Sequence, residues 1–204
     1  MSVITNIEEL RAVIGEEIPG LGEKNIDELD SFAIEFIEKS PFLVLTTSDN
    51  NGRCDASPKG DSPGFVSVLD EKTIIIPDRP GNKLAYGHLN IIENPHVGII
   101  FLIPGSSETL RINGKAELDC SPELLNHLSA RGKPAILAIR VNIEECFFHC
   151  AKAFIRSGLW DTGSWPDEPH KVSFGKIYAS RKKASEEVAS LIDESIKADY
   201  ENNL

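Results

Sequence analysis

From Phe42 onward, apolar and polar residues alternate along the chain, and short turns separate the alternating runs. The run Phe42–Ser48 is followed by Asp-Asn-Asn-Gly at residues 49–52, four residue types that tolerate the backbone angles of a tight turn, and then by a returning run at residues 53–57. This combination is typical of a β-hairpin, because the side chains of a strand point alternately to its two faces. The sequence after Phe42 is therefore expected to fold mainly as antiparallel β structure.

Further segments with the same pattern follow. They predict strands at residues 65–69, 73–76, 96–103, 109–118 and 134–143, a helix at residues 82–90, and a short helix that begins at Ser121-Pro122-Glu123. These segments indicate a small barrel of six or so antiparallel strands with peripheral helices, an α+β class that is mainly β. A doubly wound sheet would need strands that alternate regularly with helices and a glycine-rich first turn, and the sequence has neither.

Helical spacing of apolar residues marks both ends of the chain. Residues 6–14 and 26–39 are predicted helices, and residues 1–40 are expected to form a leader that packs on the barrel. Residues 41–180 are the barrel domain. Residues 181–204 are expected to form one amphipathic helix with Val188, Leu191, Ile192 and Ile196 on one face, which gives a single domain overall.

Charge and composition restrict the class of protein. The 204 residues carry 21 basic and 32 acidic side chains, a net charge of −11, which argues against general affinity for nucleic acid or an anionic membrane. No long apolar run is present, and residues 1–20 are acidic where a signal peptide would be basic, so a soluble cytoplasmic protein is expected. The four cysteines lack paired spacing, so free thiols and no bound metal are expected.

The candidate functional stretch is residues 74–83, Ile-Ile-Ile-Pro-Asp-Arg-Pro-Gly-Asn-Lys. Three β-branched residues predict a buried strand, and the two prolines and the glycine end it just before a helix. Such a turn presents free backbone N–H groups and the positive end of a helix dipole, to which Arg79 and Lys83 add two cations. This chemistry suits a phosphate. The alternative is an ordinary strand-to-helix connection with solvated basic residues.

Three motifs in order resemble one family. They are Ile-Pro-Asp-Arg-Pro-Gly-Asn-Lys at residues 76–83, Ile-Glu-Asn-Pro-His-Val-Gly at 92–98, and Glu-Thr-Leu-Arg-Ile-Asn-Gly-Lys-Ala at 108–116. Together with residues 148–160, they resemble the FMN-binding split β-barrel family related to pyridoxamine 5′-phosphate oxidase, most closely an uncharacterised bacterial branch. The resemblance covers about residues 42–165 and implies a six-stranded antiparallel split β-barrel. It also implies a homodimer with two FMN sites at the subunit interface, each built from both chains.

The resemblance also implies cofactor-binding residues. Asn82 and Lys83 fall where the family has a phosphate-binding pair that is usually Arg-Lys, so Arg79 or Arg111 is expected to supply the missing cation. Pro77 and Asp78 belong to the same phosphate turn. Thr109 matches a position that reaches the flavin from a strand. Because Thr109 and Arg111 are two residues apart, they share a face of that strand. The alternative for Arg111 is a surface residue that faces an acidic partner.

Two further groups are candidates for contacts with the flavin. In relatives, the strand edge equivalent to Ser57 and Lys59 runs along the isoalloxazine ring, so these two residues are expected near N1, O2 or N5; the alternative is a polar loop. Lys152, Arg156 and Ser157 recur at helical spacing beside Trp160, which gives a basic face next to an aromatic ring. This face suits an anionic cofactor or a ring from the neighbouring subunit, and internal ion pairs are the alternative.

The resemblance favours an enzyme, an FMN-dependent oxidoreductase that transfers a hydride through flavin N5 with an unidentified small-molecule substrate. No catalytic residue is assigned, and His149 is interpreted as a core histidine rather than a proton donor. Oxidation of pyridoxamine phosphate itself is disfavoured, because residues 186–201 form an acidic helix instead of the Arg-x-His-x-x-Arg type of ending. The alternatives are a non-catalytic flavin-binding protein and a binder of haem or another ligand, with His149 or His96 as axial ligand.

Overall fold

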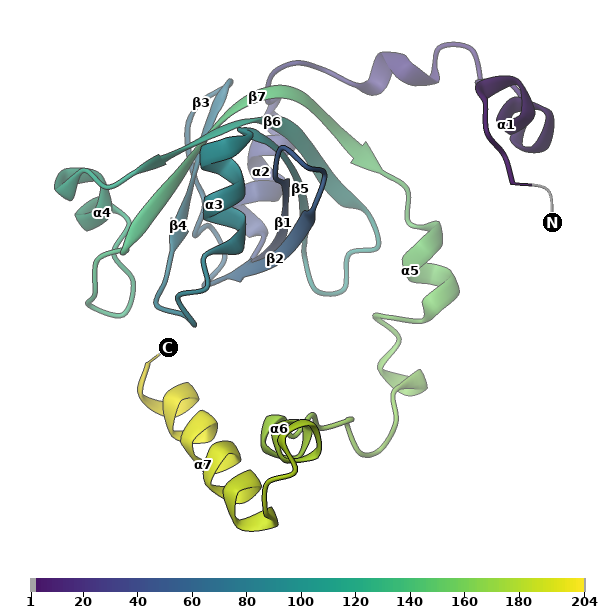
Figure 1. The fold of residues 1–204 in the computed structure, drawn as a ribbon. Coiled ribbons are helices and arrows are strands. Elements are labelled where there is room, and N and C mark those ends of the chain that lie inside the picture. The colour runs from purple at the N-terminus through teal and green to yellow at the C-terminus, as the bar shows by residue number, and fades with distance from the viewer. Residues whose placement is uncertain (1–2, 204) are drawn as a thin grey trace.

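The computed structural model describes residues 3–203 and is built on one antiparallel sheet that curls around a core (Figure 1). The strand order across the sheet is β2-β1-β5-β6-β7-β4-β3. The strands are β1 (Phe42–Ser48), β2 (Cys54–Gly60), β3 (Ser67–Asp70), β4 (Thr73–Asp78), β5 (His96–Leu102), β6 (Thr109–Asp119) and β7 (Leu137–His149).

The prediction of a mainly β antiparallel fold is confirmed, but the expected number of six strands is wrong. The sheet has seven strands, and its order is open, with β2 and β3 at the two edges. The short β3 remains in the sheet because it pairs with the first half of β4, where Ser67 lies opposite Ile75. β7 runs well past its predicted end at residue 143, because it pairs with β6 as far as the pair Thr109 and His149.

The core fills the concave side of the sheet. Alternate residues of the strands point into it, and the fully buried ones include Leu43, Leu45, Ile74, Ile76, Ile99, Phe101, Leu110, Ile112, Ile139 and Val141. Helix α2 (Ser31–Lys39) covers this side through Ala33 and Ile37. The period of two in the sequence therefore places one face of each strand in the core.

Helix α2 begins later than the predicted residue 26. Ile26 instead forms an isolated bridge with Cys146 on β7, in which each backbone N–H donates to the other's carbonyl. The side chain of Asp30 then caps the helix by accepting a hydrogen bond from the Ala33 N–H, at 2.8 Å. Burial raises the pKa of the Cys146 thiol to about 12, so this cysteine is a core residue and not a reactive thiolate.

The remaining helices lie around the sheet or extend from it. Helix α3 (Tyr86–Glu93) and helix α4 (Pro122–His127) lie beside it, and α1 (Ile7–Ile14), α5 (Lys152–Ser157), α6 (Phe174–Lys182) and α7 (Glu186–Asn202) belong to the two terminal arms, with short 3-10 turns at Leu21–Lys24 and Thr162–Ser164. Among residues 3–203, no helix combines the length and the hydrophobicity that crossing a bilayer requires.

Two expectations about the arms need correction. Residues 3–40 do not pack on the sheet as one unit, because α1 has no buried residue and stands apart from the sheet (Figure 1). The single helix predicted at residues 181–204 is instead the end of α6 followed by α7, since α6 ends at Lys182, Lys183 adopts a left-handed conformation, and Ser185 caps the start of α7. The division into leader, barrel and C-terminal segment stays a prediction.

Two phenylalanines offer a matched test of this packing. Phe101→Ala removes a fully buried ring from the core, and we expect it to lower the free energy of unfolding by about 3–5 kcal/mol. Phe32→Ala removes a ring that is 69% exposed on α2, and the expected change is within about 0.5 kcal/mol. Urea unfolding followed by circular dichroism measures both. Equal losses in the two variants would contradict the assignment of the core.

Candidate functional site

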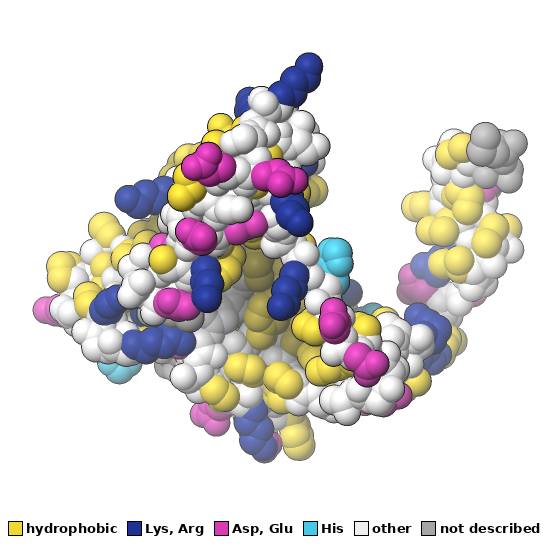
Figure 2. All heavy atoms as spheres, turned by 90° about the horizontal axis from the view of Figure 1, so that it is seen from below, with side chains coloured by type: hydrophobic (Ala, Val, Ile, Leu, Met, Phe, Trp, Pro, Cys, Tyr) yellow, Lys and Arg dark blue, Asp and Glu magenta, His cyan; other side chains and the backbone are white. Residues whose placement is uncertain are grey.

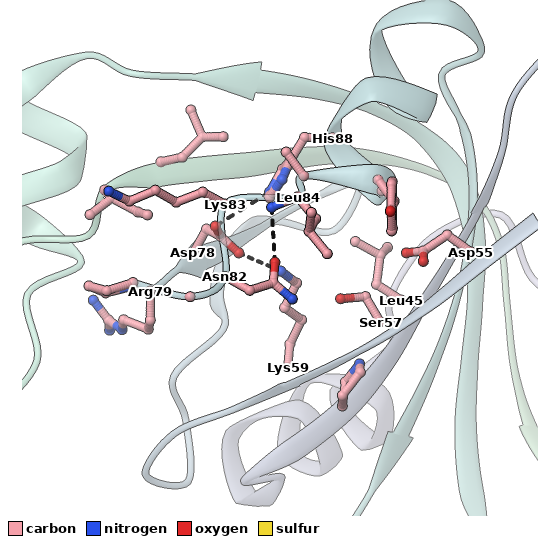
Figure 3. A pocket seen from close by; sticks show the side chains of 18 of the residues that line it. Leu45, Asp55, Ser57, Lys59, Asp78, Arg79, Asn82, Lys83, Leu84 and His88 are labelled. Atoms are coloured by element: carbon pink, nitrogen blue, oxygen red, sulfur yellow. Dashed lines mark hydrogen bonds and ion pairs between the residues drawn. The ribbon is translucent and has the colours of Figure 1, made fainter. Parts of the chain in front are cut away.

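A cleft of about 760 Å³ opens between β2, the end of β4 and the start of α3 (Figure 3). This volume lies in the usual range for small-molecule sites. The cleft lies where the sheet fails to close, because the pairing of β3 with β4 reaches only as far as Ile75 and leaves the second half of β4 facing β2 without a ladder between them. The residues that line it are Leu45, Asp55, Ser57, Pro58, Lys59, Gly60, Pro77, Asp78, Arg79, Pro80, Gly81, Asn82, Lys83, Leu84, Ala85, Tyr86, Gly87, His88, Ile136 and Leu137.

The loop between β4 and α3 shapes one wall of the cleft. Pro77 is accommodated in β4 because one side of the strand has no hydrogen-bonding partner there. Beyond it, Lys83 and Ala85 adopt positive φ values of 61° and 56°, and the Asn82 side chain accepts a hydrogen bond from the Leu84 N–H at 2.9 Å. The predicted helix start at residue 82 is therefore wrong, since left-handed residues interrupt helical geometry and α3 begins at Tyr86.

The start of α3 presents backbone donors to this wall. The first helical hydrogen bond at this end runs from the Leu89 N–H to the Ala85 carbonyl, at 2.9 Å. The N–H groups of Tyr86, Gly87 and His88 have no acceptor within residues 3–203. Together with the positive end of the helix dipole, they favour an anion in the cleft.

The floor of the cleft holds a cluster of charged residues from three elements (Figure 3). Lys59 on β2 forms an ion pair with Asp78 Oδ1 at the end of β4, and the two side chains are only 15% and 11% exposed. His88 on α3 places Nε2 3.4 Å from Asp78 Oδ2, which is long for a hydrogen bond. This buried nitrogen has no hydrogen-bonding partner in the described chain. A single carboxylate thus lies between an ammonium and an imidazole.

The environment keeps Asp78 ionised. Burial by itself would raise the pKa of this carboxyl, but the contacts with His88 and Lys59 outweigh burial and lower the pKa below the ordinary value of 3.8. Because Asp78 is charged, it balances the charge of Lys59. The floor of the cleft therefore carries little net charge while His88 is neutral.

Arg79 lies at the edge of the cleft, with its guanidinium held by the protein. Its Nε lies 3.0 Å from Asp61 Oδ2, and Nη1 donates to the Leu128 carbonyl at 2.8 Å. These contacts connect the loop after β4 with the segments after β2 and α4. Lys83, by contrast, has no ion pair within residues 3–203, which makes it a cation available to a ligand.

Seven of the predicted cofactor-binding residues line this cleft. They are Ser57, Lys59, Pro77, Asp78, Arg79, Asn82 and Lys83. The structure brings these residues together from β2 and from the turn after β4, although more than a hairpin separates them in the sequence. Their role in binding a cofactor stays a prediction.

The six other predicted residues lie elsewhere. Thr109 and Arg111 share a face of β6 as expected. The intervening Leu110 points into the core and is fully buried, so Thr109 and Arg111 lie on the opposite face of the strand. The Arg111 guanidinium lies over the Phe147 ring, 5.3 Å from its centroid. Lys152, Arg156 and Ser157 lie on α5. Trp160 stacks on Phe154 and donates Nε1–H to the Ser106 carbonyl at 2.7 Å.

Among the lining residues that sequence reasoning missed, two can carry a charge and contact the start of α3 or the Asp78 carboxylate. His88 reads as an ordinary helix residue, and only the late start of α3 places it in the first helical turn beside Asp78. Asp55 reads as a solvent-facing position of β2, yet its Oδ2 would lie 3.2 Å from a Cβ at Gly87. No pattern in the sequence distinguishes either residue, because each is identified by a contact between α3 and a strand, His88 with the end of β4 and Asp55 of β2 with the Gly87 position.

The lowered pKa of Asp78 predicts how the free energy of unfolding depends on pH. Since its folded pKa is below the unfolded value of 3.8, its stabilising contribution is full above that value and is lost as the pH falls through the lower folded pKa. We expect Asp78→Asn to lower the free energy of unfolding by about 3 kcal/mol near neutral pH, because the change leaves Lys59 buried and unpaired. The difference between wild type and variant should shrink in strong acid.

Urea unfolding at about pH 6 and about pH 3 measures this dependence. The exposed Asp167→Asn is the control, which should match the wild type at both pH values. A stability difference for Asp78→Asn that stays constant over this range would show that the carboxylate does not act through its charge.

Comparison with known proteins places most of the chain in one family. The family model described as pyridoxamine 5′-phosphate oxidase matches residues 29–150, a stretch that includes every residue of the cleft. No curated protein matches the chain.

Several solved structures are similar to this one at low identity. HupZ from Group A Streptococcus is 18% identical, with a TM-score of 0.48 over 59% of this chain and 93% of that chain. An FMN-binding protein from Syntrophomonas wolfei subsp. wolfei is 14% identical, with a TM-score of 0.44 over 57% of this chain and 88% of that chain. Similarity at this level carries no argument about what this chain binds.

Proposed function

The chain belongs to the pyridoxamine 5′-phosphate oxidase family, and from this membership and the cleft we propose that it binds FMN and acts as an oxidoreductase on a small molecule. When bound, FMN would supply hydride transfer at N5 of its ring. The observation that carries the proposal is the set of three N–H groups at the start of α3, which follows Lys83 by three residues; within residues 3–203 the N–H groups have no acceptor and Lys83 has no ion pair. This set suits the phosphate of the cofactor.

The residues of the loop fit a phosphate group in number and kind. Lys83 supplies one charge and Asn82 a side-chain amide, and Tyr86, Gly87 and His88 supply backbone donors. Each charge-assisted hydrogen bond of this type contributes roughly 1.5 to 3 kcal/mol. The carboxylate of Asp55 approaches the same helical turn from β2. We therefore place the phosphate on the side of Lys83, away from Asp55.

The floor of the cleft suits the flavin ring. Ser57 and Lys59 lie on the same face of β2 and both line the cleft, so they can contact one planar ligand. Lys59 is held in place by Asp78, which fixes its ammonium at the floor. A cation in this position would stabilise negative charge at the N1 and O2 side of the ring.

The proposal includes a homodimer that completes each site. Thr109 and Arg111 face away from the cleft of their own chain, and α5 with Trp160 extends beyond β7. We propose that these residues, with Lys152, Arg156 and Ser157, contribute to the site of the partner subunit. Arg111 then joins Lys83 as a cation for the cofactor, while Arg79 serves the fold through Asp61.

The first test is the visible absorption spectrum of the purified protein, before and after excess FMN is added and the free cofactor is removed. We expect the two bands of oxidised flavin to remain with the protein. Bleaching of these bands by a nicotinamide would distinguish an oxidoreductase from a protein that only carries flavin. A Soret band in place of the flavin bands would mean a haem protein, and absence of any retained flavin would overturn the proposal.

Lys83 provides a prediction about affinity. Lys83→Ala should weaken FMN binding by roughly ten- to a hundredfold, because one charge-assisted contact with the phosphate is lost. Quenching of flavin fluorescence during titration measures the dissociation constant. Lys39→Ala, at an exposed lysine on α2, is the control and should leave it unchanged. Equal affinities for wild type and Lys83→Ala would place the phosphate elsewhere.

A further inference from the structure

The C-terminal helices α6 and α7 form a well-defined hairpin. Gly175 packs so closely on α7 that a Cβ there would lie 1.9 Å from the Ala189 carbonyl oxygen. Asp193 on α7 accepts hydrogen bonds from the Gly175 N–H, at 2.8 Å, and from the Ser173 hydroxyl. These contacts fix the two helices relative to each other. The two helices therefore form one rigid hairpin.

Several apolar side chains of this hairpin are exposed. Gly175 is the buried residue of α6 and Ala189 that of α7, whereas Phe174, Tyr178 and Leu191 are about half exposed or more. Two short helices with so little buried between them gain their stability from a further surface. The N-terminal arm is exposed in the same way, as the uncovered apolar side chains beside its grey tip show in Figure 2.

One face of α7 combines apolar and acidic groups. Glu187, Leu191 and Glu194 recur at spacings of four and three residues, so they lie on one side of the helix. Leu191 is 60% exposed, and neither glutamate has an ion pair within residues 3–203. This face is complementary to a surface that is apolar at its centre and basic at its edges.

The mouth of the cleft is such a surface. Leu84 and Tyr86 lie exposed on the α3 side, and Ile136 lies exposed on the β7 side. Basic residues lie close to them in the sequence: Lys83 of the cleft lining precedes Leu84, and Lys133 lies three residues before Ile136. Lys133, like Lys83, has no ion pair in the described part of the chain. The mouth therefore matches α7 in both hydrophobicity and charge.

We infer that two copies of the chain exchange their C-terminal hairpins, so that α7 of one copy covers the mouth of the cleft in the other. Both surfaces belong to the same chain and are exposed in it. In a symmetric dimer, α7 of each copy can therefore cover the cleft mouth of the other copy. The inference rests on the homodimer of the proposed function. It adds that each cleft is completed by an acidic helix from the partner subunit.

Carbodiimide cross-linking tests the exchange, because this reagent joins a carboxylate directly to a nearby lysine. Unlabelled and heavy-nitrogen-labelled chains are mixed, unfolded and refolded together, cross-linked, and examined by mass spectrometry. We expect links from Glu187 or Glu194 to Lys133, with mixed-isotope pairs in statistical proportion. Links found only between peptides of one isotope would mean that the hairpin folds back on its own chain, and absence of links to the cleft would equally overturn the inference.

A pair of variants separates docking from general surface effects. Leu191→Glu should remove these links and raise the dissociation constant of the dimer by roughly tenfold or more, since an apolar anchor is lost. Ile7→Glu, at a side chain on α1 that is 76% exposed, should change neither. A Leu191→Glu protein that links and sediments like the wild type would contradict the exchange.

The outcomes also separate this inference from the flavin proposal. Chains that retain FMN but sediment as monomers would overturn the exchange and leave FMN binding in place. Dimers with mixed-isotope links that retain no FMN would support the exchange and overturn the flavin proposal.

Discussion

The buried carboxylate of Asp78 closes a gap that the backbone leaves open. β2 is one edge of the sheet, and β4 lies next to the other edge, so no ladder of hydrogen bonds connects them. The ion pair between Lys59 and Asp78 spans this gap, and the contact of Arg79 with Asp61 spans it a second time. The two edges of the curled sheet are thus joined by side chains. The cleft exists because side chains, unlike a backbone ladder, leave room between the strands.

The energetic cost of burying charges explains why the two edges are joined by one ion-pair cluster and not along their whole length. Removing a carboxylate and an ammonium from water is costly, and the attraction between them offsets that cost only when the geometry is good. Asp78 achieves this with two partners, since Lys59 contacts one oxygen and His88 approaches the other. The lowered pKa of Asp78 shows that these contacts outweigh burial. The cluster therefore fixes where β2, β4 and α3 meet more than it adds to overall stability.

Much of the fold could be predicted from the sequence, because it depends on local patterns. Alternation of apolar residues identified the strands, and the turn at residues 49–52 identified the first hairpin. The start of α3 could not be predicted, since Lys83 and Ala85 adopt positive φ without being glycine. The break between α6 and α7 has the same cause at Lys183. Propensities give no warning of a left-handed lysine or alanine, because the surrounding structure imposes it.

Some features of the candidate site could likewise be predicted from local sequence patterns, and others could not. The turn after β4 and the shared face of Thr109 and Arg111 follow from sequence spacing alone. The sequence spacing does not show on which side of the sheet this face lies, because that depends on where the core forms. Leu110 is buried in the core, so Thr109 and Arg111 lie on the side away from the cleft. His88 and Asp55 join the site only through contacts between α3 and the strands β4 and β2.

The charges of the cleft finally limit what it can hold. Lys59 is balanced by Asp78 and Arg79 by Asp61, so of the three basic residues in the cleft lining only Lys83 is left unbalanced within the described chain. The N–H groups at the start of α3, which have no acceptor within residues 3–203, follow Lys83 by only three residues. A single chain therefore offers one electropositive end and a nearly neutral floor. Such a cleft suits a ligand with one anionic group and a neutral planar body, and a polyanion would need the cations of a second subunit.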